Sequence, residues 1–325
     1  MKKVLITGIS GFVGSHLAEL LINEGVEVHG AIRWRAPLDN ISHIPSNKLT
    51  LHNMDIRDLV SCMNVIGEVK PDYIFHLAGQ SYVPESWNAP AETLTTNIVG
   101  TANILEAIRK QGIDTVMQMA GSSEEYGLVL PKEVPITESH PLRPQSPYGV
   151  SKVACDLLCQ QYYRSYGIKT VITRAFNHEG ARRGEVFVTS NFAKQIAMIE
   201  KKRLPPVIKV GNLGARRDYT DVKDMVRAYW LAVQHCTYGE PYNICSGKAW
   251  VIGDMLNYLI ALSPMSGEIK VETDPTRMRP SDVPNLVGSC NKFRCITGWA
   301  PKIDFVETLM DTLDYWRAKT TSLPK

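Results

Sequence analysis

The sequence of 325 residues lacks the patterns that mark several large classes of protein. Its seven cysteines, at positions 62, 155, 159, 236, 245, 290 and 295, form no CxxC pair. Scattered cysteines of odd number predict reduced thiols, with neither a disulfide framework nor a zinc site. No apolar run approaches the ~18 residues that a membrane span requires, and Val4-Leu5-Ile6 is too short for the core of a signal peptide. We therefore expect a cytoplasmic protein with no membrane partner and no metal.

A large excess of charge of one sign is also missing. The formal net charge is +3 and the pI is about 8.4, without any basic block or stripe. Nucleic acid is therefore not an expected partner, whereas a small anionic ligand would suit this mild balance. The hydrophobic content of 44% is ordinary for a globular protein, and the length predicts one large domain with a smaller lobe.

Short apolar segments alternate with amphipathic ones through the first half of the chain. We expect strands at residues 3–7, 27–32, 49–53, 73–76, 115–120 and 169–174, and helices at 14–24, 91–110 and 148–166. This alternation predicts an α/β fold with a doubly wound parallel sheet. After about residue 177 the alternation of strands and helices becomes irregular. We therefore divide the chain into a dinucleotide-binding domain (1–176), to which some later segments return, and a substrate lobe that takes up most of 177–325.

A glycine-rich turn, TGISGFVG, follows the first expected strand and opens the first helix at residues 7–14. Gly8 would allow the tight turn, Gly11 the approach of a pyrophosphate, and Gly14 close packing of the helix on the strand. Phe12 and Val13 begin the helix, whose free N–H groups favour phosphate. The turn predicts a Rossmann-type dinucleotide site, and a plain strand-to-helix turn is the alternative.

An acidic residue is missing from the end of the second strand, where NAD enzymes usually hold the ribose hydroxyls. The chain continues there with Arg33-Trp34-Arg35. Arg33 is expected to bind a 2′-phosphate, which favours NADP(H) over NAD(H), and Arg33 or Trp34 could cover the adenine. The alternative is that Arg33 and Arg35 are solvated charges. Asp55 and Ile56, after the third strand, are expected at the adenine edge.

The sequence YGVSK places Tyr148 and Lys152 one helical turn apart, on the same face of a helix. A lysine ammonium and the positive ring of an oxidised cofactor would both stabilise the phenolate, so Tyr148 is a candidate acid/base. Lys152 could also hold the nicotinamide ribose. Ser122, near the end of a strand, is expected to hydrogen-bond a substrate oxygen, and Glu124 to act as a second acid/base. The alternatives are an exposed Tyr–Lys pair and, for Glu124 and Glu125, an acidic surface turn.

These motifs together resemble the extended short-chain dehydrogenase/reductase family, whose members act on nucleotide sugars. Further matching motifs are HLAG at 76–79, Asn97, SSEEYG at 122–127, RAFNH at 174–178, RDY at 217–219 and YNICSG at 242–247. The resemblance implies cofactor contacts from Leu77, Ala78, Gly79 and Asn97, beside those of Tyr148 and Lys152. It implies a nucleoside-diphosphate site lined by Ser81, Asn177, Val188, Arg217, Arg279 and Asp282. Arg217 suits the diphosphate as a bidentate donor; the alternative is a structural salt bridge to Asp221 or Asp224.

Two groups of GDP-mannose enzymes in this family are most similar. Residues 76–85, 121–127, 192–196 and 275–288 resemble reductases of GDP-4-keto-6-deoxymannose, and residues 177–189 resemble GDP-mannose 4,6-dehydratases. The reductase-like segments cover more of the chain, so we expect reduction to GDP-rhamnose with Tyr148 as proton donor. The alternative is a dehydratase with Glu124 as the base at C5. Arg33 disfavours a 4-epimerase, and the intact Ser122, Tyr148 and Lys152 disfavour a non-catalytic dinucleotide-binding protein.

The resemblance also implies a homodimer, or a tetramer, formed through the helices at 91–110 and 148–166. Leu157, Leu158 and Tyr162 are the candidate contacts on the second of these helices. The alternative is that these three side chains face the core of their own chain.

Overall fold

A seven-stranded sheet forms the larger part of the molecule in the computed structural model, which describes residues 1–277, 283 and 285–321. The strand order is β10-β6-β5-β4-β1-β2-β3, and every pair is parallel. The strands are β1 (Lys3–Thr7), β2 (Glu27–Ile32), β3 (Leu49–Asn53), β4 (Tyr73–His76), β5 (Val116–Ser122), β6 (Lys169–Ala175) and β10 (Glu240–Ile244). The predicted α/β class with a doubly wound parallel sheet is confirmed.

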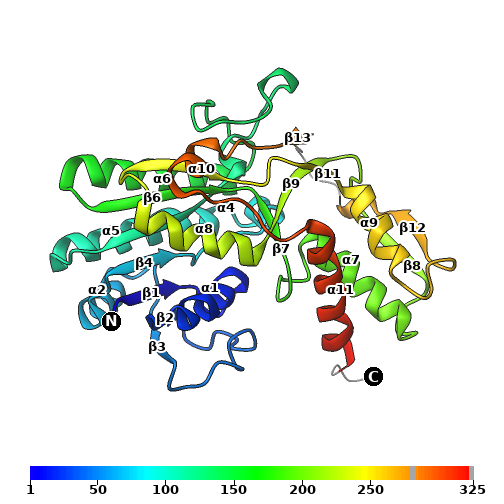
Figure 1. The fold of residues 1–325 in the computed structure, drawn as a ribbon, viewed down its shortest axis with the longest axis horizontal. Coiled ribbons are helices and arrows are strands. Elements are labelled where there is room, and N and C mark those ends of the chain that lie inside the picture. The colour runs from blue at the N-terminus through cyan, green and yellow to red at the C-terminus, as the bar shows by residue number, and fades with distance from the viewer. Residues whose placement is uncertain (278–282, 284, 322–325) are drawn as a thin grey trace.

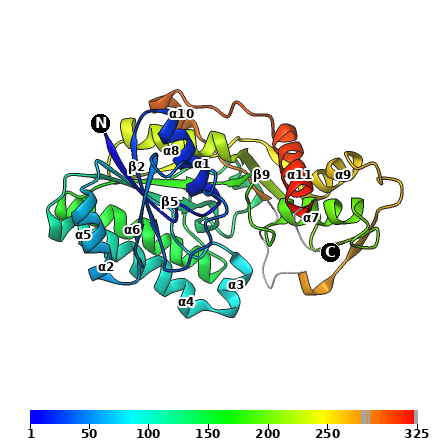
Figure 2. The same cartoon turned by 90° about the horizontal axis from the view of Figure 1, so that it is seen from below.

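Helices cover both faces of this sheet, as Figure 2 shows. One face carries α1 (Phe12–Asn23) and α8 (Val222–His235); the other carries α2 (Leu59–Val69), α5 (Gly100–Gln111) and α6 (Pro147–Tyr166). Because side chains alternate along a strand, Val4 and Ile6 belong to one buried cluster and Leu5 belongs to the other. A strand buried on both faces explains the continuous apolar runs in the sequence.

The helix expected at 91–110 is built differently from the prediction. It consists of α4 (Pro90–Leu94), a π-helical turn at Thr95–Val99 and α5. The wider turn has a physical cause, because Asn97 within it is buried and binds backbone groups of a neighbouring loop. π-helical turns of this kind occur often near functional sites, and periodicity alone did not reveal this one.

The later part of the chain contributes both to the large sheet and to a smaller group of elements (Figure 1). β10 joins the edge of the sheet beside β6, and α8 packs on its face. The smaller group buries a third hydrophobic cluster among α7 (Val188–Glu200), α9 (Ile252–Ala261) and α11 (Phe305–Thr321). Its strands are β7 (Asn177–Glu179), β8 (Val207–Val210), β9 (Arg216–Asp221), β11 (Ala249–Val251), β12 (Lys270–Thr273) and β13 (Asn285–Leu286).

The remaining short helices connect these elements. They are α3 (Val83–Asn88), η2 (Ser123–Glu125), η3 (Pro131–Glu133), η4 (Pro275–Arg277) and α10 (Asn291–Thr297). The seven cysteines are free thiols, and Cys295 is the exposed one. Among the described residues, no helix combines the length and apolar character that crossing a membrane demands.

Asp224 of α8 is expected to be a large contributor to stability. Its buried carboxylate accepts hydrogen bonds from the backbone N–H groups of Lys302 and Ile303, at 2.7 and 2.8 Å, and from Arg227. Asp224→Ala would leave these donors unpaired and should lower the free energy of unfolding by about 3 kcal/mol, measured by urea denaturation. The control Asp311→Ala removes the exposed ion pair with Lys223 and should cost below about 0.5 kcal/mol. Equal losses in both variants would contradict this assignment.

Candidate active site

A cavity of about 1340 Å³ lies at the carboxyl ends of the central strands and extends to the smaller group of elements. This is where ligands bind in open parallel sheets. The cavity lining includes these residues predicted from the sequence: Gly8, Gly11, Phe12, Val13, Gly14, Arg33, Asp55, Ile56, Leu77, Ala78, Gly79, Ser81, Ser122, Glu124, Tyr148, Lys152, Asn177, Val188 and Arg217. Arg279 and Asp282 lie outside the described residues.

The glycine-rich turn requires glycine at two positions. Gly8 adopts a positive φ of 71°, and a Cβ on Gly14 would lie 2.4 Å from the carbonyl oxygen of Gly8. Gly14 therefore allows α1 to pack directly on the turn. No side chain caps the N-terminus of α1 at Gly11, so the first N–H groups of the helix can serve an anionic ligand.

A buried histidine holds the next loop of the cavity in place. Thr101 donates its hydroxyl hydrogen to Asn97, so it accepts from Nε2 of His76 at 3.1 Å. Nδ1 of His76 then accepts from the Thr7 hydroxyl at 2.9 Å, and Thr7 accepts the N–H groups of Leu77 and Ala78. Burial lowers the pKa of His76 to about 3, so the ring is neutral, as this chain of bonds requires.

Asn97 does not reach the cavity lining. Its Oδ1 accepts the N–H of Gln80, and its Nδ2 donates to the carbonyl oxygen of Gln80 and to the Ser151 hydroxyl. Asn97 thus fixes the loop at Gly79 and Gln80 from behind and ties it to α6. Asn97 is buried within the π-helical turn, and its expected contact with the cofactor stays a prediction.

The rim near β2 and β3 brings basic groups together. Arg33 lines the cavity, whereas Trp34 is 75% exposed and does not. Asp55 is bound by Arg57, with Arg57 Nη2 2.6 Å from Asp55 Oδ2, and this hydrogen bond lowers the pKa of Asp55. Arg57 also lines the cavity and was not identified from the sequence. The two arginines leave this rim suited to a phosphate.

Ser122, Tyr148 and Lys152 all face the same cavity from β5 and α6. Lys152 Nζ donates to the carbonyl oxygen of Ala120 at 2.8 Å and lies 5.9 Å from the centroid of the Tyr148 ring. The strand backbone therefore holds the ammonium group close to the phenol. Ser146 begins α6 by accepting the N–H of Gly149, which orients this first turn.

The two glutamates after Ser122 have different positions. Glu124 is half-buried and lines the cavity, and its backbone N–H donates to the Ser122 hydroxyl at 3.2 Å. Glu125 is fully buried, and its Oε2 lies 3.3 Å from Nε of Arg174. The alternative of an acidic surface turn is therefore wrong for Glu125. The sequence does not show which residue of a single helical turn faces the core, so the different burial of Glu124 and Glu125 could not be predicted from it.

The candidate substrate residues come from three separate elements. Asn177 lies on β7 beside Tyr219 of β9, Val188 begins α7, and Arg217 is a buried residue of β9. Arg217 donates to the carbonyl oxygen of Arg216 at 2.9 Å. The two acids considered as its salt-bridge partners bind other groups: Asp221 accepts from Thr308, and Asp224 pairs with Arg227.

The loop after β7 adds residues to the cavity that sequence reasoning missed. The Arg183 guanidinium lies 3.9 Å from the centroid of the Phe187 ring, and its Nε is 3.4 Å from Oε2 of Glu179. Burial raises the pKa of Glu179 to about 7, although Arg183 opposes this. The Arg182 guanidinium donates to the Glu19 carboxylate of α1, and this contact holds the loop against α1. The dehydratase-like motif at 177–189 pointed to this segment of the sequence, but it did not show that the loop lies against α1.

The glycine-rich turn, the Ser–Tyr–Lys set that lines the cavity and the second group of elements define an enzyme of the extended short-chain dehydrogenase/reductase type. The chain belongs to the GDP-mannose 4,6 dehydratase family, whose model matches residues 5–312.

Individual relatives match nearly the whole chain. GDP-6-deoxy-D-mannose reductase of Pseudomonas aeruginosa is 32% identical over 319 residues, with 98% of each chain covered. GDP-mannose 4,6-dehydratase of Yersinia enterocolitica is 33% identical and covers 100% of this chain and 97% of its own. The solved structure of RMD from Pseudomonas aeruginosa complexed with NADPH has a TM-score of 0.82 and 31% identity, with 98% of this chain and 100% of that chain covered.

Arg33→Ala tests the phosphate-binding character of the rim. Loss of a charge-assisted contact to the 2′-phosphate should raise the Kd for NADPH about tenfold or more, while the Kd for NADH changes little. Both constants can be measured by the quenching of protein fluorescence. Arg35→Ala, whose guanidinium lies over the exposed Trp34 ring, is the control. A parallel loss of NADPH and NADH affinity would contradict a role for Arg33 in 2′-phosphate recognition.

Proposed function

We propose that this protein is an NADP(H)-dependent GDP-sugar enzyme that reduces the 4-keto group of GDP-4-keto-6-deoxymannose to give GDP-rhamnose. The full-length match to a GDP-6-deoxy-D-mannose reductase, with 98% of both chains covered, is the observation that favours this substrate. The cavity lined by Ser122, Tyr148 and Lys152 supports hydride-transfer chemistry.

The residues around the glycine-rich turn fit a dinucleotide. The uncapped N-terminus of α1 and the close packing that Gly14 permits suit a pyrophosphate, and Arg33 and Arg57 suit a 2′-phosphate. Leu77, Ala78 and Gly79 would border the nicotinamide half, together with Lys152. When bound, NADPH supplies the hydride for the C4 carbonyl of the sugar.

The chain's own groups manage the oxygen at C4. Tyr148 donates its phenolic proton to that oxygen as the carbonyl becomes an alcohol. The ammonium group of Lys152, held by Ala120, favours the resulting phenolate. Ser122 donates a hydrogen bond to the oxygen and stabilises the negative charge that develops there. Ser81, Asn177, Val188 and Arg217 would hold the nucleotide sugar, with Arg279 and Asp282 from the segment outside the described residues.

A 4,6-dehydratase is the second candidate function, because Glu124 supplies the carboxylate that this reaction needs as a base. Glu124 lines the cavity with Ser122 and Tyr148, and a dehydratase relative is 33% identical to the chain. In that reaction Tyr148 would take the proton of the C4 hydroxyl, with the C4 hydride passing to bound NADP⁺. Glu124 would take the C5 proton and give it to the C6 hydroxyl, which leaves as water. The hydride would then return to C6 and a proton to C5, so the cofactor is not consumed. A reductase does not require this carboxylate.

The same reasoning extends to the organisation of the protein. Residues 1–176, with the returning β10 and α8, would form the cofactor domain, and most of 177–325 the substrate lobe. We expect a homodimer, or a tetramer made of two such dimers, that forms through α5 and α6. On α6 the apolar side chains of Val150 and Leu157, seven residues apart, are exposed. Tyr162 instead binds Glu106 of its own chain. We place the enzyme in the cytoplasm.

Product analysis distinguishes the two candidate reactions. With GDP-4-keto-6-deoxymannose as substrate, the protein should oxidise one NADPH for each sugar reduced, measured as the loss of absorbance at the nicotinamide band. With GDP-mannose and a catalytic amount of NADP⁺, no 4-keto product should accumulate. Formation of that ketone at a comparable rate would instead establish the dehydratase.

Tyr148→Phe should lower kcat by roughly 10²–10⁴-fold, because it removes the proton donor and leaves the ring in place. The Kd for NADPH should stay within about threefold of wild type. Tyr166→Phe changes an exposed tyrosine at the end of the same helix and should retain full activity. Turnover near the wild-type rate in Tyr148→Phe would refute the assignment of the site.

A further inference from the structure

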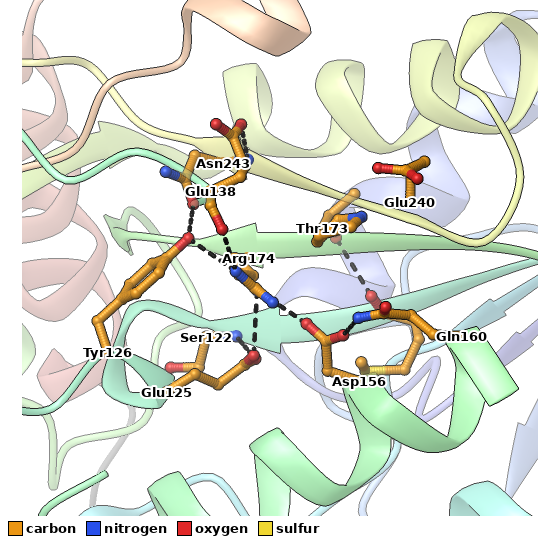
Figure 3. A network of polar contacts seen from close by, with 12 residues as sticks. Ser122, Glu125, Tyr126, Glu138, Asp156, Gln160, Thr173, Arg174, Glu240 and Asn243 are labelled. Carbon is orange, nitrogen blue, oxygen red and sulfur yellow. Dashed lines mark hydrogen bonds and ion pairs between the residues drawn. The ribbon is translucent and has the colours of Figure 1, made fainter. Parts of the chain in front are cut away.

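The carboxyl group of Glu125 lies directly beneath the catalytic candidate Ser122 (Figure 3). Its Oε1 accepts the backbone N–H of Ser122 at 2.7 Å. A Cβ on Gly121 would lie 2.7 Å from that same oxygen, so a glycine provides the space into which the carboxyl group folds back. In the segment GSSEE at 121–125, the small residue at 121 therefore allows the hydrogen bond between Glu125 and Ser122 at the end of β5.

Glu125 shares one guanidinium group with a second buried acid. Arg174 of β6 has its Nε 2.8 Å from Oδ2 of Asp156 and 3.3 Å from Oε2 of Glu125. The side chains of both acids are 0% exposed, and that of Arg174 is 4% exposed. Nη1 of the same guanidinium group donates to the Tyr126 hydroxyl and to the carbonyl oxygen of Glu138.

The bonding of the two acids is unequal. Asp156 accepts a hydrogen bond from Arg174 and another from Gln160. Oε2 of Glu125 is buried and accepts no hydrogen bond of acceptable geometry from any described residue. Two ionised carboxylates beside one guanidinium would leave a net negative charge without solvent, which is very unfavourable. A proton on Oε2 removes that charge and supplies a donor for Asp156.

We propose that Glu125 is a positioning residue that acts as a neutral carboxylic acid, fixing Ser122 through Oε1 and Asp156 through Oε2. Asp156 lies one helical turn after Lys152 on α6, so Glu125 connects the turn that carries Ser122 to the helix that carries Tyr148 and Lys152. The proposal rests on the proposed function, in which Ser122 binds the reacting oxygen.

The groups that face Glu125 agree with a neutral acid. Burial, followed by the charge of Asp156, raises the pKa of Glu125 well above its ordinary value, although Arg174 opposes this. The neighbouring titratable groups are Tyr126 and the thiols of Cys155 and Cys159 on α6, and burial raises the pKa of each. These neighbours therefore stay uncharged at neutral pH. Asp156 and Arg174 are the charged groups that act most strongly on the carboxyl group of Glu125, while Lys152 acts on Cys155 and Glu138 acts on Tyr126.

Stability against pH tests the protonation of Glu125 without any substrate. In the unfolded chain the acid ionises near its ordinary pKa of about 4.3, whereas in the folded protein it stays neutral. Stability from this difference is complete below that value and is lost as pH rises toward the raised folded pKa. Glu125→Gln has no such loss. Its thermal unfolding midpoint should therefore rise relative to wild type by roughly 2 °C per pH unit between pH 5.5 and 8.

The matched control is Glu200→Gln, which removes an ordinary carboxylate bound by the fork of Arg317 at 2.8 and 2.9 Å. Its midpoint should differ from wild type by a constant amount over the same pH range. A constant difference for Glu125→Gln as well would mean that Glu125 is ionised, and would overturn the proposal.

Kinetics test the positioning of Ser122. Glu125→Gln keeps an oxygen for the Ser122 N–H and an N–H₂ group for Asp156, so kcat should stay within about threefold of wild type at pH 7. Glu125→Leu keeps the bulk but loses both bonds, and kcat should fall by at least about tenfold. KM and the Kd for NADPH should change by less than about threefold.

Each of the other kinetic outcomes would overturn one specific claim. Equal loss of kcat in Glu125→Gln and Glu125→Leu would overturn the neutral role, and wild-type kcat in Glu125→Leu would overturn the positioning role. Lack of turnover by the wild-type protein on either GDP-sugar would instead refute the proposed function. In that case the pH dependence of the unfolding midpoint still decides whether Glu125 is neutral.

Discussion

The burial of one arginine constrains the centre of this protein more than any other single interaction. Arg174 lies on β6 with almost no exposed surface, so every donor of its guanidinium group needs a partner inside the protein. Asp156, Tyr126 and the backbone of residue 138 accept its hydrogen bonds from separate elements, and the carboxyl group of Glu125 lies 3.3 Å from its Nε (Figure 3). Tyr126 extends the network to Asn243 of β10. The edge strand, the helix α6 and the turn after β5 are thereby joined at one point.

This arrangement explains why the candidate catalytic groups lie on rigid elements. Ser122 ends β5 and is held by Glu125 at its backbone N–H, while Lys152 is hydrogen-bonded to Ala120, two residues earlier on the same strand. Neither contact depends on the loops of the smaller lobe. Groups that must keep their geometry during a reaction are best supported in this way. The loop at 177–189, by contrast, brings Arg183 to the cavity from outside the sheet.

A second buried network sets the opposite side of the cavity. Neutral His76 links Thr7 to Thr101, and Asn97 links Gln80 to Ser151. The HLAG motif at 76–79 is thus partly structural, because its histidine does not line the cavity while Leu77, Ala78 and Gly79 do. Neighbouring residues of one sequence motif therefore differ in role, because some line the cavity and others support the lining. Within this motif one residue supports the loop from behind and the next three line the cavity.

The amino-acid sequence was enough to predict the parallel sheet, the exact limits of its first four strands, the glycine-rich turn and the Ser122–Tyr148–Lys152 set. These features depend on local periodicity and on spacing within one turn or one helix, which neighbouring residues decide. The folded chain was needed to show that Glu125 and Asn97 are buried, that Glu124 faces the cavity, and that Arg57 and Arg183 line it. Each of these outcomes depends on partners such as Arg174, Gln80 or Phe187, which are distant in the sequence. Burial and charge compensation are properties of that assembled surrounding, so no local pattern encodes them.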